Sequence, residues 1–280
     1  MDTSFPVPNK IESEYTTGLD YWMKKKYEKK LATGFPELNE LLDGGFSRGM
    51  VTILYGSRKP IIRILLNSAI NALLSSVDGG MNSGNVVYVD AENTFNPYYL
   101  SEKIRVLGYQ PETLLKKIDV SRVFNWNQMV EVMSEKVPER KPHTLIVSGY
   151  NSMFEYSQKS FEDLQLMNAG IKSIMKYNPV VVLGTRMHFN SEIVPMGGKV
   201  LSQFGGVLVS IVEKERHYDF TLQKHPAYPT KSTRVWKETA LLSPKSLPRS
   251  YTKDKALRGK HLTLDTFVNV NSFINDLEGE

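Results

Sequence analysis

The chain has 280 residues, of which 41% are hydrophobic, with a formal net charge of +5 and no cysteine. It is long enough for one large domain with a sizeable core, and the lack of cysteine excludes disulfides, thiolate metal sites and a cysteine nucleophile. No apolar run approaches the roughly 18 residues of a membrane helix, the N-terminus lacks a secretory signal, and the histidines show no metal-ligand spacing, so we expect no metal and no membrane.

The basic residues gather in two stretches. Lysines crowd residues 24–30, and basic side chains dominate residues 231–260, where Glu238 and Asp254 are the acidic exceptions. The last twenty residues are acidic instead. Basic stretches indicate a polyanionic partner, although charge runs are also common on solvated segments.

Apolar runs and glycine or proline punctuation predict alternating strands and helices. The expected strands are residues 50–56, 85–91, 117–123, 144–148 and 180–185, followed by a hairpin of 205–214 and 218–224. The expected helices are residues 19–30, 36–42, 60–74, 97–107, 127–136 and 161–177, with a short one near Phe273.

The predicted strands are apolar without polar alternation, which is typical of parallel strands covered on both faces. We therefore predict an α/β fold: a mostly parallel central sheet with helices on both faces and an antiparallel hairpin at one edge. The domain division would be an N-terminal extension (1–30), a core (31–236) and a basic C-terminal extension (237–280).

Five collinear segments resemble the core of the RecA/RadA recombinase family, closest to its archaeal and eukaryotic branch. They are LATGFPELNELLDGGFSRGMVTILYG, VVYVDAENTFNPYYL, YQPETLLKKIDVSRVFNWNQM, PMGGKVLSQF and QKHPAYPTKS. The resemblance covers residues 31–236 and implies a RecA-like core, and we expect this chain to lack the family's separate N-terminal helical domain.

The segment GSRKPIIR stands where the family has its phosphate loop, G-x-x-x-x-G-K-[ST]. Gly56 occupies the first position, but Ile61, Ile62 and Arg63 replace the second glycine, the lysine and the hydroxyl. Pro60 also removes a backbone N–H that could hold a phosphate. We therefore expect no nucleotide cofactor, unless Lys59, three residues early, replaces the lost lysine.

A second part of the family's reaction centre is altered. Ser148 and Gly149 follow the strand TLIV, where an aspartate would organise Mg²⁺. Glu92 stands where the family places the glutamate that activates water, and Arg186 stands where it has a glutamine that senses the γ-phosphate. Gly56, Glu92, Ser148 and Arg186 are thus relic positions, and we predict a degenerate ATPase that is not an enzyme.

We hypothesise that Arg186 forms an ion pair with Glu92 and replaces a charge once supplied by Mg²⁺ and nucleotide. The alternative is that both side chains point to solvent. A residual ATPase activity that depends on Glu92 is a further alternative.

The resemblance implies two loops that hold single-stranded DNA, about residues 150–163 and 187–204. Lys159 is the candidate DNA contact of the first. In the second, the pair Gly197–Gly198 would offer backbone N–H groups to phosphates, Lys199 would add charge, and His188, Phe189 and Met196 would stack on bases. A loop with no ligand is the alternative.

The stretch from Lys231 to Lys260 is a second candidate DNA contact, because spaced cations on a flexible segment suit phosphate neutralisation. A solvated tail is the alternative. Its candidate residues are Lys245, Arg249, Lys253, Lys255, Arg258 and Lys260.

The functional prediction is an ATP-independent recombinase paralogue that binds single-stranded DNA or modulates the main recombinase or other paralogues in recombination and repair. It would lie inside the cell, in the cytoplasm or nucleoid, or in a eukaryotic nucleus. The alternative is a non-catalytic scaffold subunit of a hetero-oligomer, in which Arg58, Lys59 and Arg63 face a protein partner. The sequence leaves the oligomeric state open.

Overall fold

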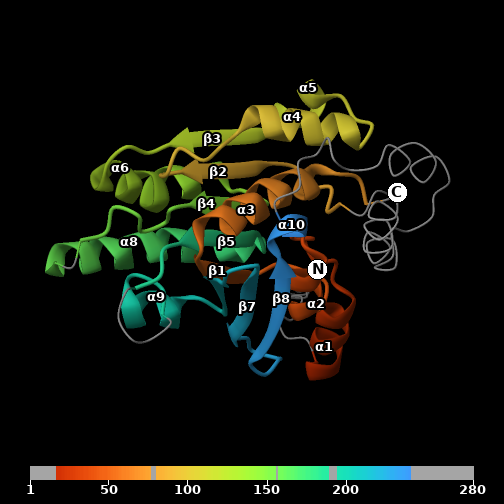
Figure 1. Ribbon diagram of the computed structural model, residues 1–280. Helices are drawn as coiled ribbons and strands as arrows, with labels where there is room; N and C mark the ends of the chain where they lie inside the picture. Colours follow the sequence, from red (N-terminus) through yellow and green to blue (C-terminus); the bar gives the residue numbers. More distant parts are fainter. Residues whose placement is uncertain (1–16, 77–79, 156, 189–193, 241–280) are drawn as a thin grey trace, which may run out of the picture.

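The computed structural model describes residues 17–76, 80–155, 157–188 and 194–240. An eight-stranded sheet runs through the molecule in the order β3-β2-β4-β5-β1-β6-β7-β8 (Figure 1). The strands are β1 (Met50–Gly56), β2 (Val86–Asp90), β3 (Ile118–Arg122), β4 (Thr144–Ser148), β5 (Val180–Thr185), β6 (Val207–Glu213), β7 (His217–Lys224) and β8 (Lys231–Trp236).

All neighbours from β3 to β6 are parallel, and β7 and β8 continue the sheet as antiparallel strands. Strands β1, β2, β4 and β5 are buried almost throughout because helices cover both of their faces. This arrangement confirms the predicted fold class, including the hairpin at one edge.

One face of the sheet packs against the first helices of the chain. Side chains from these helices share a core with β1, β2 and the hairpin strands, and Leu54, Ile64 and Tyr88 are fully buried there. The helices are α2 (Pro36–Leu41), α3 (Arg58–Leu73), α4 (Pro97–Val106) and α5 (Pro111–Leu115).

The opposite face packs against the later helices, with Ile53, Leu145 and Leu183 fully buried in a second core. These helices are α6 (Trp126–Glu131), η1 (Val132–Lys136), α7 (Val137–Arg140), α8 (Gln158–Ile174), η2 (Met175–Tyr177) and α9 (Gly198–Phe204). The single helix predicted over 127–136 is thus longer and contains one π-helical turn, η1, in its middle.

Two further predictions need correction. Helix α3 begins at Arg58, two residues before Pro60, so the proline lies within the first turn. Residues Lys231–Trp236 are not part of a flexible basic tail but form β8, which pairs with β7. The apolar contribution of β8 is small, with only Val235 buried, and a strand with so few inward side chains gives a weak sequence pattern.

The N-terminal part contains α1 (Gly18–Tyr27), close to the predicted helix 19–30. The residues directly after α1 are hydrogen-bonded to the rest of the described chain. Asn178 Nδ2 donates to Glu28 Oε1 at 3.0 Å, and Lys29 Nζ donates to the Ser76 carbonyl at 3.1 Å. Within the described part of the chain, none of the helices combines the length and hydropathy needed to cross a bilayer. The division of the chain at residues 30 and 236 stays a prediction.

Candidate functional site

The parallel strands end at one edge of the sheet, and this edge brings the predicted relic positions together. Register pairs Asp90 with Ser148, Ser148 with Gly184, and Tyr55 with Thr185. The residues that follow β1, β2, β4 and β5 therefore lie side by side, which is where ligands bind in open α/β sheets.

Gly56 turns the chain from β1 into α3. Its φ of +117° belongs to a region that only glycine adopts readily, and a Cβ there would overlap the carbonyl oxygen of Ile211. The next N–H, that of Ser57, donates to the same oxygen at 2.8 Å. The backbone thus passes tightly over β6 as it enters the helix.

The first turn of α3 packs as an ordinary helix start. Ile61 is 5% exposed and lies so close to Gly184 that a Cβ on that glycine would be 2.9 Å from the Ile61 Cγ2 methyl. Ile62 packs, partly buried, against the core. The Arg63 guanidinium lies 4.3 Å from the centre of the Tyr99 ring on α4, a cation–π arrangement.

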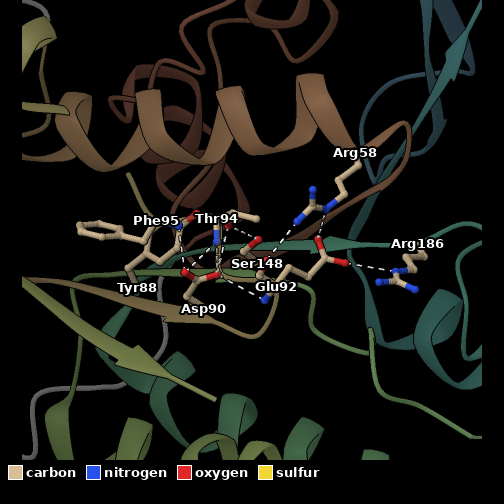
Figure 2. A network of polar contacts seen from close by, with 8 residues as sticks. All are labelled: Arg58, Tyr88, Asp90, Glu92, Thr94, Phe95, Ser148 and Arg186. Carbon is tan, nitrogen blue, oxygen red and sulfur yellow. Dashed lines mark hydrogen bonds and ion pairs between the residues drawn. The ribbon is translucent and has the colours of Figure 1, made fainter. Parts of the chain in front are cut away.

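A buried carboxylate fixes the loop after β2 (Figure 2). Asp90 is 1% exposed. Its oxygens accept hydrogen bonds from the backbone N–H groups of Thr94 and Phe95 at 2.9 Å, and from the Thr94 hydroxyl at 3.1 Å. The Glu92 N–H points to the same carboxylate at 3.3 Å. Sequence analysis missed this anchor, although an acidic residue directly after a buried strand was the available signal.

Two arginines bind the Glu92 carboxylate, one at each oxygen, as Figure 2 shows. Arg58 Nε lies 3.1 Å from Glu92 Oε2, and Arg186 Nε lies 3.1 Å from Glu92 Oε1. Arg58 Nη2 also donates to the Glu92 carbonyl at 3.0 Å. The Glu92 side chain is 8% exposed, whereas both arginine side chains are 57% exposed. We call these three residues the Glu92 clamp.

The ion pair between Glu92 and Arg186 confirms the hypothesis drawn from the sequence, and the solvent-facing alternative is wrong for Glu92. The contribution of Arg58 is a correction, because sequence reasoning offered it only as a partner-facing cation. Arg58 and Glu92 are 34 residues apart, so their contact depends on strand order and has no local signal.

The altered end of β4 is part of the same packing. The Thr94 hydroxyl donates to Ser148 Oγ at 2.8 Å, which links the loop after β2 to β4. Gly149 has φ +74°, and a Cβ there would lie 2.5 Å from Glu92 Cγ. The small residue at this position therefore leaves the space that the Glu92 side chain fills.

The first predicted DNA loop joins β4 to α8 and touches the second. Asn151 is fully buried, and its Nδ2 donates to the carbonyl of Met196. The Tyr150 hydroxyl donates to Asn168 Oδ1 at 2.8 Å, which fixes the start of this loop on α8. Lys159, the predicted DNA contact, is exposed on the first turn of α8.

The second predicted loop directly follows Arg186. Its two ends form a narrow antiparallel ladder: the Met196 N–H donates to the Arg186 carbonyl and the His188 N–H to the Val194 carbonyl, both at 2.9 Å. The loop thus starts and returns beside the Glu92 clamp. Phe189 lies outside the described residues.

Two predicted contacts in this loop, Gly198 and Met196, are placed differently. Gly197 and Gly198 both have positive φ, as their glycine identity allows, but the Gly198 N–H donates to the Pro195 carbonyl at 3.0 Å and does not point outward. Met196 packs, partly buried, against the core below α8 and does not extend as a free stacking group. Lys199 is exposed and His188 half-buried.

The predicted DNA contacts in the C-terminal stretch lie outside the described residues. They are Lys245, Arg249, Lys253, Lys255, Arg258 and Lys260.

Comparison with known proteins shows the family to which this chain belongs. A model of the Rad51 family matches residues 24–176, more than half of the chain. The chain belongs to the Rad51 family. A curated relative, the DNA repair and recombination protein RadA of Aeropyrum pernix, is 26% identical over 217 residues, which cover 71% of this chain and 68% of the relative. The family expected from the sequence is therefore confirmed.

A half-buried lysine lies between α3 and α4 in this Rad51-family chain. Lys103 Nζ on α4 donates to Asn67 Oδ1 on α3 at 2.6 Å, and the Tyr99 hydroxyl donates to the same oxygen at 2.8 Å. Burial, followed by repulsion from Arg63, lowers the pKa of Lys103 to about 7. Two cations, Arg63 and Lys103, thus crowd the interface between α3 and α4.

Replacing Lys103 with methionine should stabilise the protein at neutral pH. The pKa of Lys103 is lower in the folded protein than in the unfolded chain, so the unfolded chain binds more protons between about pH 7 and pH 10.4. The lysine therefore lowers the free energy of unfolding most below pH 7, and this loss of stability shrinks as the pH rises. We expect a gain of about 1–2 kcal/mol at pH 6.5, discounted for partial exposure, that vanishes towards pH 10. Urea unfolding at several pH values measures it; Lys116→Met, at an exposed lysine, should show no such pH dependence.

Proposed function

We propose that this Rad51-family protein acts in DNA recombination and repair by binding single-stranded DNA without ATP, alone or beside the main recombinase. The observation that carries the proposal is the Glu92 clamp. Its ion pairs within the chain occupy the carboxyl edge of the parallel strands, where the family resemblance implies a nucleotide site. The family match and the RadA relative, whose name states DNA repair and recombination, support the process.

The residues at the edge fit ATP and Mg²⁺ poorly. Pro60 has no N–H to donate to a phosphate, and Ile61 packs onto Gly184 in place of a glycine. Arg63, where a hydroxyl would hold Mg²⁺, lies on the Tyr99 ring. The Ser148 hydroxyl, where an aspartate would stand, accepts from Thr94. We therefore propose a degenerate ATPase and derive no step that uses a nucleotide.

The clamp also offers a reason why DNA binding would not need ATP. Arg186 is both the partner of Glu92 and the residue just before the second loop, and the Met196 N–H of that loop donates to the Arg186 carbonyl. Asn151 ties that return strand to the first loop. An internal carboxylate would thus hold the base of both loops in one position, a role that a bound nucleotide could otherwise fill.

The test is binding of the purified protein to labelled single-stranded DNA, followed by fluorescence anisotropy over a salt series with and without Mg-ATP. We expect binding that weakens as salt rises, because phosphate contacts release counterions, and that is unchanged by Mg-ATP. Binding that requires ATP would contradict the proposal. Absence of binding at low salt would favour the scaffold subunit that contacts proteins only.

A further inference from the structure

A shallow pocket of about 400 Å³ lies at the opposite edge of the sheet from the Glu92 clamp. It opens where β1 and β6 begin, beside the ends of α8 and α9 and the loop that follows β7. Its apolar lining includes Met50, Met175, Phe204 and Pro226. The pocket therefore lies away from the Glu92 clamp and meets the second predicted DNA loop only at its last residue, Phe204.

The charged side chains that line this pocket are both lysines. Lys224 Nζ donates to the carbonyls of Ser202 at 3.1 Å and Gly205 at 2.8 Å, so its charge is fixed at the end of α9. Lys172 is exposed near the end of α8 and forms no ion pair with the described residues. An apolar group with a carboxylate beside it would match this combination.

The chain carries such a segment at its own end. Residues 265–280 read DTFVNVNSFINDLEGE, in which Phe267 and Phe273 stand among carboxylates and there is no lysine or arginine. A phenylalanine buries roughly 150–250 Å² when it is enclosed, which makes it a strong anchor.

The segment can reach the pocket within one chain. Helix α10 (Lys237–Ala240) is held near the far end of β6 by the 2.6 Å ion pair from Lys237 to Glu213, so it lies about one strand length, roughly 25 Å, from the pocket. The 32 residues between Ala240 and Phe273 can span roughly 100 Å when extended.

We propose that the pocket binds the acidic C-terminal segment of the same chain, with the Phe273 ring against Met175 and Phe204 and the carboxylates of Asp276 and Glu278 beside Lys172. The pocket would be a docking surface on the side of the molecule remote from the Glu92 clamp. It does not depend on the proposed DNA function.

Zero-length carbodiimide crosslinking of the full-length protein, read by mass spectrometry, tests this placement. We expect an amide between Lys172 and Asp276 or Glu278. When ¹⁵N-labelled and unlabelled protein are mixed before crosslinking, both peptides of this product should carry the same label, because the amide forms within one chain. Phe273→Ser should reduce the yield at least tenfold, while the matched variant Phe267→Ser should change it less than twofold. Unchanged melting temperatures would show that both variants fold.

Three results would overturn the proposal: no amide from Lys172 to residues 265–280, amides from these carboxylates to the lysines of 24–30 instead, or a yield that is insensitive to Phe273→Ser. Mixed-label amides would overturn the same-chain form and show that the segment comes from a second copy.

Discussion

Replacing Asp90 with asparagine is expected to lower the free energy of unfolding by about 2–4 kcal/mol. The carboxylate is 1% exposed and accepts from the backbone N–H groups of Glu92, Thr94 and Phe95 and from the Thr94 hydroxyl. An asparagine has one oxygen and one NH₂ group, so in either orientation it places N–H against N–H. At least one buried donor of the loop from Glu92 to Phe95 then loses its acceptor.

Urea unfolding followed by circular dichroism measures this effect. The matched control is Asp119→Asn on the edge strand β3, where the carboxylate is 52% exposed and lies 3.8 Å from Arg140. Exposed pairs of this kind contribute little, so we expect a change below about 0.5 kcal/mol. Equal effects of the two substitutions would mean that the Asp90 hydrogen bonds do not hold the loop.

Replacing Glu92 with glutamine is expected to weaken binding to single-stranded DNA at least tenfold. Charge alone predicts the opposite, because loss of a carboxylate makes the protein more basic and should favour a polyanion. The clamp predicts weaker binding because glutamine cannot neutralise two guanidinium groups. Arg186 and the loop that starts from it would lose their fixed position. The two explanations therefore differ in sign.

Anisotropy titrations of the parent and variant at one salt concentration measure the change. Glu131→Gln is the matched control, because Glu131 is an exposed acidic residue on α6, outside both predicted DNA loops, and its ion pair with Lys136 is 3.8 Å long. It should bind DNA equally or slightly more tightly. If Glu92→Gln behaves like this control, the clamp does not organise the DNA loops. Unfolding of Glu92→Gln should show a loss of about 1–2 kcal/mol.

The order of strands and helices followed from local patterns. Apolar runs of five to seven residues such as VVVLGT and TLIVS leave few alternatives to buried parallel strands, and glycines and prolines mark where they end. The resemblance to the recombinase family placed Glu92 and Arg186 in one reaction centre, and they follow β2 and β5, two parallel strands whose carboxyl ends share an edge with β4 between them. Their ion pair was therefore predictable from chemistry and topology together.

Strand β8 and the exact start of α3 were not predictable. In β8 only Val235 points into the core, since the strand lies at the open edge of the sheet, so no alternating pattern marks it. The proline at position 60 suited the first turn of a helix but did not say how many residues precede it. Such boundaries depend on which backbone groups find partners, and here Ser57 finds the Ile211 carbonyl.

The sequence by itself determined the fold class and the family pattern and led to the prediction of an altered phosphate loop, because these depend on residue type and spacing along the chain. Only the tertiary structure decided that Arg58 joins Arg186 on Glu92, that Asp90 anchors the loop between them, and that burial beside Arg63 lowers the pKa of Lys103. Each of these is a contact or a desolvation between segments far apart in sequence. Such effects arise from the three-dimensional packing of strands and helices, which local pattern does not encode.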